Sequence, residues 1–227
     1  LPFRTPKKSV YFFMQKIDTS NIENWPGKVI LGVVEIEEGY SIKILSAREK
    51  EEYAGFSNDK RKAEYLSARH LFHSLAESLN DEGLEKRVEL HKEDSGKPFA
   101  KFGEEIIYTS FSHSPSKVFC AISDTFDIGL DVELSNREVN DAVVNRILND
   151  EEHHLAEEEE PIRLWTIKEA AVKCLGTGLR TNLDDLTIQK NEKNRFSVRF
   201  NNDKMFEICS FRQTDHQIAL AYQSKNS

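Results

Sequence analysis

The chain has 227 residues, 38% of them hydrophobic and 31% charged, which excludes a disordered protein, and no apolar run approaches the roughly 20 residues of a membrane span. The net charge of −8 argues against general nucleic-acid binding, because a phosphate backbone requires a basic surface. Three widely spaced cysteines are typical of reduced core residues, so we expect a cytoplasmic globular protein with no nucleic-acid and no membrane partner.

The first half of the chain is predicted to form strands, then helices, then strands again. Ser46 is a typical N-cap residue, and either Asn58 or Asp59 can open the next helix, which carries an apolar stripe. A Ser-Gly-Lys-Pro turn precedes the later strands. In chain order, the predicted elements are strands over 9–15 and 28–37, helices over 47–53 and 60–79, and strands over 87–91, 106–112, 118–123 and 126–134.

The second half repeats this plan loosely. A break at Pro161 separates two predicted helices, and a Gly-Thr-Gly stretch ends the second. Thr214 and Asp215 are expected to form the turn of a final hairpin. The predicted elements are helices over 139–158 and 162–175, then strands over 185–190, 195–200, 205–211 and 217–223. This order predicts an α+β fold with two lobes, residues 1–120 and 121–227.

The stretch FDIGLDVEL places two carboxylates on one face of a strand. Ile128, Leu130 and Val132 alternate as an apolar face, so Asp131 and Glu133 share the opposite face with Gly129. Oxygen ligands of this kind suit Mg²⁺. Taken alone, the pair fits exposed acids on an edge strand better than a metal site. In a metal site, we expect Gly129 to leave room beside the carboxylates for a pyrophosphate.

The stretch RLWTIKEAAVKCLGTGL contributes a second charged group. Glu169 and Lys173 stand four residues apart on one helix face, and Lys168 is adjacent to Glu169. Such a pair is usually a surface salt bridge, but this helix is largely apolar. Together with Asp131 and Glu133, these residues could form a site for phosphoryl chemistry, in which lysine steadies a leaving oxygen and a carboxylate accepts a proton.

IGLDVE at 128–133 followed by LWTIKEAAVKCLGTGL at 164–179 resembles the signature pair of the 4′-phosphopantetheinyl transferases of the surfactin-synthetase-activating type. NDKRKAEYLSAR at 58–69, GKPF at 96–99 and SFSHS at 110–114 resemble first-lobe motifs of that family, in the expected order. The resemblance implies transfer of the phosphopantetheine arm of coenzyme A to a serine of an apo acyl or peptidyl carrier protein, with release of 3′,5′-ADP. It also implies a monomeric pseudodimer of two similar α+β lobes, with the active site in the cleft between them.

The resemblance assigns roles to individual residues. It implies that Asp131, Glu133 and Glu169 bind Mg²⁺ or, as the alternative, Mn²⁺, and that Glu169 is also the base for the serine. The implied catalytic residues are Glu169 and Lys173. The implied coenzyme A contacts lie in the first lobe and on the second-lobe helix, and they are Arg61, Lys97, Pro98, Ser112, His113, Lys168 and Lys173. Arg69 is an additional candidate in the first lobe.

Two other functions remain open on the residues alone. A metal-dependent nuclease also uses acidic residues with a nearby lysine, although the acidic chain argues against it. A non-catalytic carrier-binding module would keep the surfaces and lose the three acids. In the position of the paired aromatic residues that the family often has, this chain has Ile147 and Leu148, so the resemblance does not locate the carrier docking surface.

Overall fold

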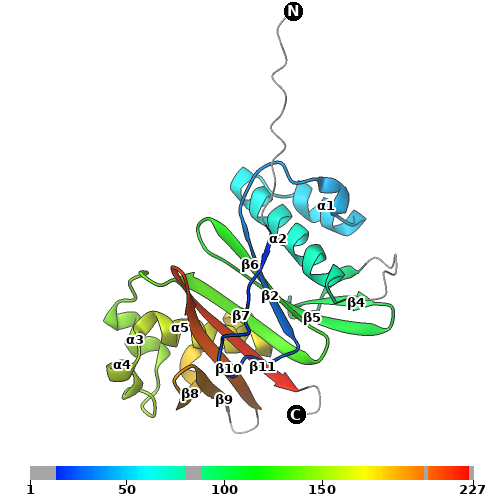
Figure 1. Cartoon of the computed structure of the whole chain (residues 1–227). Helices are drawn as coiled ribbons and strands as arrows, with labels where there is room; N and C mark the ends of the chain where they lie inside the picture. The colour runs from blue at the N-terminus through cyan, green and yellow to red at the C-terminus, as the bar shows by residue number, and fades with distance from the viewer. Residues whose placement is uncertain (1–13, 80–87, 202–203, 225–227) are drawn as a thin grey trace, which may run out of the picture.

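The computed structural model describes residues 14–79, 88–201 and 204–224, which form two antiparallel sheets (Figure 1). In the first sheet, the described strands follow the order β1 (Gln15–Lys16), β2 (Val29–Glu35), β6 (Lys117–Ser123), β5 (Glu105–His113), β4 (Pro98–Phe102) and β3 (Glu89–Lys92). In the second, the order is β7 (Phe126–Leu134), β11 (His216–Ser224), β10 (Lys204–Gln213), β9 (Arg195–Phe200) and β8 (Leu186–Glu192). The predicted α+β class is confirmed, whereas the relation of the lobes as a pseudodimer stays a prediction.

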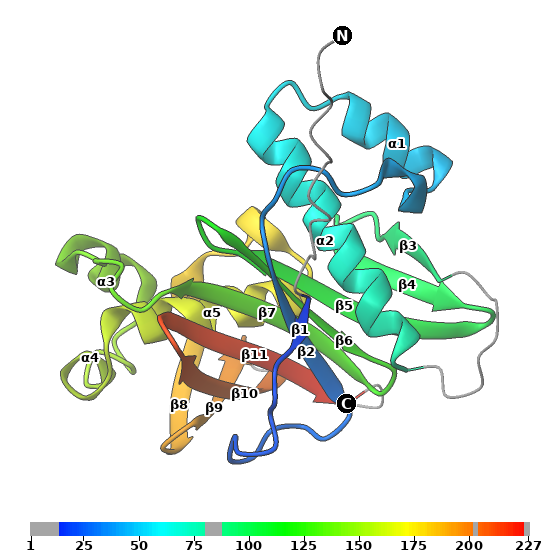
Figure 2. The same ribbon diagram turned by 45° about the horizontal axis from the view of Figure 1, so that its top comes forward.

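Helix α2 (Asp59–Glu77) covers one face of the first sheet, as Figure 2 shows. Asn58 caps it by accepting a hydrogen bond from the amide of Arg61, and its apolar side chains include the fully buried Leu71 and Phe72. The preceding helices are η1 (Ile42–Ile44) and α1 (Ala47–Ala54). Ser46 and Glu49 form a capping box at the start of α1, so the N-cap predicted from sequence is confirmed.

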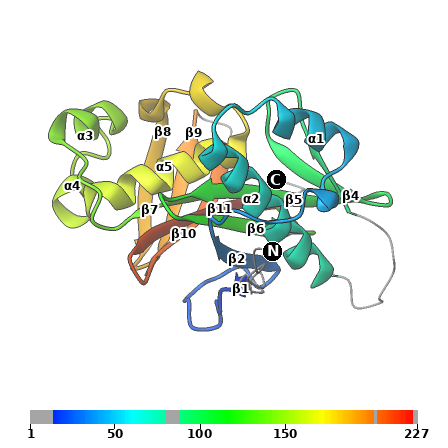
Figure 3. The same ribbon diagram turned by 90° about the horizontal axis from the view of Figure 1, so that it is seen from above.

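Helix α5 (Pro161–Leu175) covers one face of the second sheet. Pro161 occupies its first turn, and Gly176 ends it in the left-handed conformation, with φ 79°. The shorter helices α3 (Asp141–Ile147) and α4 (Leu155–Glu158) lie at the end of the molecule away from α1 (Figure 3). The turns η2 (Gly178–Arg180) and η3 (Leu183–Asp185) connect α5 to β8.

A third apolar cluster lies between the two sheets. Leu31 on β2 and Phe119 on β6 belong to the same buried cluster as Leu130 on β7 and Ile218 on β11. Neighbouring residues on those strands face the helices instead, because side chains alternate along a strand. The layers therefore run helix, sheet, sheet, helix, and the two sheets share a core.

One helix expected from sequence differs in the structure. The single helix predicted over 139–158 is two short helices, because Glu152 in the connection is buried and hydrogen-bonded to the amides of Asn149 and Ile188. The predicted strand over 9–15 lies mostly outside the described residues. The chain passes from one sheet to the other between Ser123 and Phe126, and the division into lobes at residue 120 stays a prediction.

In the part of the chain that the structure describes, no helix combines the length and the apolar character that crossing a bilayer requires.

Candidate active site

Helix α5 packs directly on strand β7, and Gly129 makes the contact possible. A Cβ atom at Gly129 would lie 2.2 Å from the carbonyl oxygen of Ala170 and 2.2 Å from the amide nitrogen of Cys174. The expectation that Gly129 leaves room for a pyrophosphate is therefore wrong, because α5 fills that space. The close approach instead places Glu169 and Lys173 of α5 beside the carboxylates of β7.

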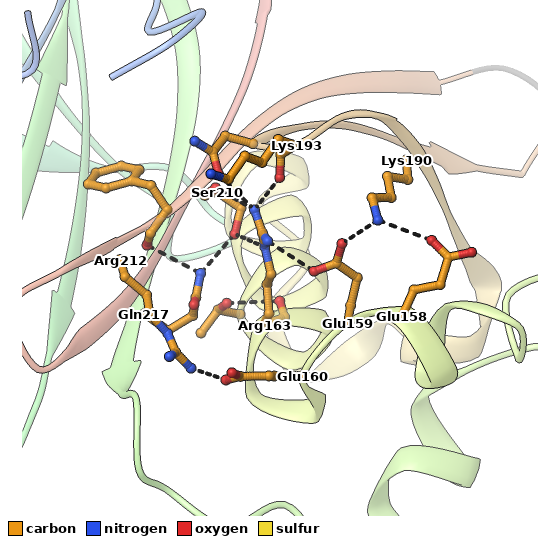
Figure 4. A network of polar contacts seen from close by, with 12 residues as sticks. Glu158, Glu159, Glu160, Arg163, Lys190, Lys193, Ser210, Arg212 and Gln217 are labelled. Carbon is orange, nitrogen blue, oxygen red and sulfur yellow. Dashed lines mark hydrogen bonds and ion pairs between the residues drawn. The ribbon is translucent and has the colours of Figure 1, made fainter. Parts of the chain in front are cut away.

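A network at the start of α5 holds the helix on the second sheet (Figure 4). Arg163 donates to the carbonyl oxygens of Lys193 and Ser210, both at 2.8 Å, and to the carboxylate of Glu159 at 2.9 Å. Its guanidinium also lies over the ring of Phe196, 4.9 Å from the centroid. Because this arginine reaches β10 and the turn before β9, it fixes the helix that carries Glu169 and Lys173.

One pocket contains four of the five charged residues predicted from the two motifs, all except Lys168. It has a volume of about 480 Å³ and lies where β5, β7, α2 and α5 meet. Asp131 and Glu133 line it from β7, and Glu169 and Lys173 line it from α5. The remaining lining residues are Lys60, Glu64, Ser112, His113, Ser114, Pro115, Val132 and Trp165.

Asp131 is the most enclosed carboxylate of this pocket, with 6% of the residue exposed. Its Oδ1 accepts from Lys173 Nζ at 2.8 Å and from the hydroxyl of Ser112 at 3.3 Å. Its Oδ2 is buried and has no hydrogen-bond partner among the described residues. A buried oxygen with unused lone pairs is costly, and a cation is one way to satisfy it.

The other two acids, Glu133 and Glu169, both have raised pKa values. Burial raises the pKa of Glu133, and the Asp131 carboxylate raises it further, against the opposing effect of Arg137. Glu169 follows the same pattern, because burial raises its pKa first and Asp131 second, while Lys173 lowers it. Arg137 is hydrogen-bonded to Glu133, and its guanidinium lies 5.4 Å from the centre of the Trp165 ring.

The donor set fits a divalent cation in its chemistry. Three carboxylates offer only oxygen ligands, which suit Mg²⁺ or Mn²⁺, and Asp131 Oδ2 is unpaired. Within residues 14–79, 88–201 and 204–224, however, no group of three or more His, Cys, Asp or Glu side chains is placed to hold a metal ion. The metal therefore remains a proposal supported by the donor chemistry and by that oxygen.

Lys168 lies outside this pocket. The residue is fully buried, and its ammonium group donates to Glu152 at 2.6 Å. Three backbone carbonyl oxygens, those of Ile147, Leu183 and Leu186, accept its other hydrogen bonds. We therefore propose no phosphate contact for Lys168, because its position joins α5 to α3, η3 and β8.

Lys97 is also placed in the interior. Its side chain is 7% exposed, and Nζ lies 2.5 Å from Asp127 Oδ1 and also donates to the carbonyl oxygen of Cys174 in the last turn of α5. A cation at a helix C-terminus is favourable, so Lys97 fastens the first sheet to α5. Pro98 follows it as the half-buried first residue of β4.

The other first-lobe candidates differ in their access to the pocket. Ser112 and His113 line it from the end of β5. Arg61 is exposed on α2 and pairs with Glu64, which is itself a lining residue. Arg69 is buried, paired with Glu49 at 3.1 Å, and its guanidinium lies 3.7 Å from the centre of the Tyr65 ring.

Two residues, one beside the pocket and one in its wall, could have been found from sequence. Asp127 continues the alternation of Gly129, Asp131 and Glu133, so it belongs to the same strand face. Trp165 precedes Glu169 and Lys173 by one and two helix turns, and it lines the same pocket. The buried His216, in contrast, has no local pattern that distinguishes it.

The fold and site together define an α+β protein with an acidic pocket, completed by a lysine, where its two sheets meet. Residues 127–222 match the family model described as the 4′-phosphopantetheinyl transferase superfamily. The chain is also similar to the 4′-phosphopantetheinyl transferase gsp of Aneurinibacillus migulanus, with 28% identity over 114 residues. The alignment covers 47% of this chain and 46% of that protein, so it spans about half the length of the relative. The resemblance predicted from the two motifs is confirmed.

Proposed function

We propose that the protein transfers the 4′-phosphopantetheine arm of coenzyme A to a serine of an apo acyl or peptidyl carrier protein and releases 3′,5′-ADP. One observation carries this proposal. Asp131, Glu133, Glu169 and Lys173 line a single pocket, and all four lie within residues 127–222, the segment that matches the family model. The proposed enzyme is a cytoplasmic monomer.

The chain's own residues divide the work of the reaction. The carrier serine oxygen forms a bond to the phosphorus of the phosphopantetheine phosphate, and the bond from that phosphorus to the bridging oxygen breaks. Glu169 accepts the proton of the serine, directly or through water. Lys173 steadies the phosphate of 3′,5′-ADP, which leaves with the electron pair.

Asp131, Glu133 and Glu169 are the residues that would hold Mg²⁺ or Mn²⁺, which when bound supplies positive charge that neutralises and orients the pyrophosphate. The unpaired Oδ2 of Asp131 supports this assignment. Lys173 contacts the other oxygen of the same carboxylate and so fixes its orientation.

The first lobe is proposed to hold the adenosine and 3′-phosphate end of coenzyme A. His113 and Ser112 are the best placed, because both line the pocket. Arg61 lies next to two lining residues of α2 and is exposed, so its side chain can reach an anion at the rim. For Lys97, a ligand contact would require it to leave Asp127.

A transfer assay tests the proposal. The protein is incubated with coenzyme A, Mg²⁺ and a panel of apo carrier proteins, and the intact mass of each carrier is measured. We expect one carrier to gain the mass of a phosphopantetheine arm on its serine. Asp131→Ala and Glu169→Ala should abolish the gain, whereas Glu157→Ala, which removes an exposed acid of α4, should not. Transfer to none of the carriers, or full activity of either pocket variant, would contradict the proposal.

A further inference from the structure

His216 connects the second sheet to the loop that ends β5. It is the first residue of β11 and is 2% exposed, with its ring against that of Phe119. Its Nε2 lies 3.0 Å from the hydroxyl oxygen of Ser114, which is 102 residues earlier in the chain. On the other side of the ring, Nδ1 lies 2.7 Å from Asp215 Oδ1.

The hydrogen bonds that link Asp215, His216 and Ser114 all run in one direction. Asp215 is held in place, since its Oδ1 also accepts from the hydroxyl of Thr214 and its carbonyl oxygen accepts from the amide of Ser135. A carboxylate only accepts, so Nδ1 of His216 carries the proton. With a neutral ring, Nε2 is then an acceptor and the Ser114 hydroxyl donates to it. Burial lowers the pKa of His216, which favours the neutral ring, although the Asp215 carboxylate opposes this.

Serine, histidine and aspartate in this order also form the relay of nucleophilic hydrolases. Two observations argue against that role here. Ser114 is 4% exposed, so its hydroxyl offers little access to a substrate. The next residue is Pro115, which has no amide hydrogen and so cannot supply the backbone donor that commonly stabilises an oxyanion beside such a serine.

The segment Ser112 to Ser114 is instead fixed to the second sheet at both ends. The hydroxyl of Ser112 accepts from the amide of Val132 at 3.0 Å and donates to Asp131. The hydroxyl of Ser114 donates to His216. His113 lies between these two anchors, is exposed and lines the pocket.

We propose that His216, oriented by Asp215, is a positioning residue that holds Ser114 and thereby sets the position of His113 in the site. This inference rests on the proposed function, because it assumes that the segment forms the coenzyme A side of the pocket. His216 touches neither substrate nor reacting atoms. It acts from the second lobe on a wall that the first lobe contributes.

The test compares steady-state kinetics of His216→Ala, Ser114→Ala and the double variant. Each single variant should raise KM for coenzyme A by about threefold to tenfold, the value of one hydrogen bond, with kcat little changed. The double variant should raise it no further, because both changes remove the same contact. His216→Gln keeps an acceptor for the Ser114 hydroxyl and should restore a low KM.

Ile218→Val is the matched control. Ile218 is two residues further along β11 on the same face, and this substitution removes one methyl group from the shared core without removing a hydrogen bond to the loop. It should lower the melting temperature and leave KM for coenzyme A unchanged. If Ile218→Val raises KM as much as His216→Ala does, or if His216→Ala leaves KM unchanged, the proposal is overturned.

A measurement without substrate separates this inference from the proposed function. In protein labelled with ¹⁵N-histidine, NMR should show His216 protonated at Nδ1 and not at Nε2. The ring signals of His113 should shift in Ser114→Ala and in His216→Ala, but not in Ile218→Val. Unchanged His113 signals would overturn the positioning role, whereas absence of transfer by the wild type would contradict only the proposed function.

Discussion

Replacing Gly129 by alanine tests the packing that joins the two parts of the candidate site. The new Cβ would lie 2.2 Å from backbone atoms of Ala170 and Cys174, where ordinary contact begins at 3.4 Å. No side-chain rotation relieves a clash with backbone, so β7 and α5 would have to separate by roughly 1 Å. Overpacking that side chains can relieve costs about 1–3 kcal/mol, so we expect Gly129→Ala to lower the free energy of unfolding by at least about 3 kcal/mol.

Urea denaturation followed by circular dichroism measures this change. Gly27→Ala is the control, because a Cβ there meets nothing within 4 Å, and its midpoint should stay near that of the wild type. Any folded Gly129→Ala protein should also lose activity by on the order of 100-fold, since an error of about 1 Å at Glu169 and Lys173 misplaces reacting groups. An unchanged midpoint for Gly129→Ala would show that α5 does not pack on β7 as described.

Three further substitutions test other parts of the structure. Asp131→Asn should reduce the transfer rate on the order of 100-fold or more with little loss of melting temperature, because the charge stabilisation a bound divalent cation supplies is large. In urea denaturation, Lys168→Met should cost about 3–5 kcal/mol by leaving the charge of Glu152 buried without a counterion, and Lys168→Met with Glu152→Gln should recover part of this, because glutamine removes the charge and keeps an oxygen that accepts from a backbone amide. The lowered pKa of His216 means that the unfolded chain binds a proton at higher pH than the folded chain does, so below pH about 6.5 the wild type should lose stability more steeply than His216→Gln.

Local signals predicted much of the second lobe. Pro161 and Gly176 mark the ends of α5 within one residue of the prediction, because both residues act on the backbone directly. The turn at Thr214, with φ 53°, joins β10 to β11 as expected. The alternation along FDIGLDVEL likewise gave the correct strand and the correct division of its faces.

The sequence pattern could not predict which element packs against each face of a strand. The pattern placed Gly129 beside Asp131 but did not show that α5 occupies the space above the glycine. The burial of Lys168 depends on Glu152 and on three carbonyl groups from separate segments, and a charged residue next to Glu169 in sequence has no signal for that. Tertiary contacts therefore decided which of the predicted lysines reach the pocket.

The position of the pocket follows from β7, which is an edge strand of the second sheet and is covered by β5 of the first sheet. An edge strand presents unpaired backbone groups, and β5 covers them with serine hydroxyls at alternate positions. Ser110 accepts from the amide of Leu130 at 2.8 Å, and Ser112 accepts from that of Val132 at 3.0 Å. The boundary between the lobes is thus polar along this edge, and Ser112, which closes it, also contacts Asp131 and Lys173. The hydrogen bonds that join the lobes therefore also orient the charged groups of the candidate site.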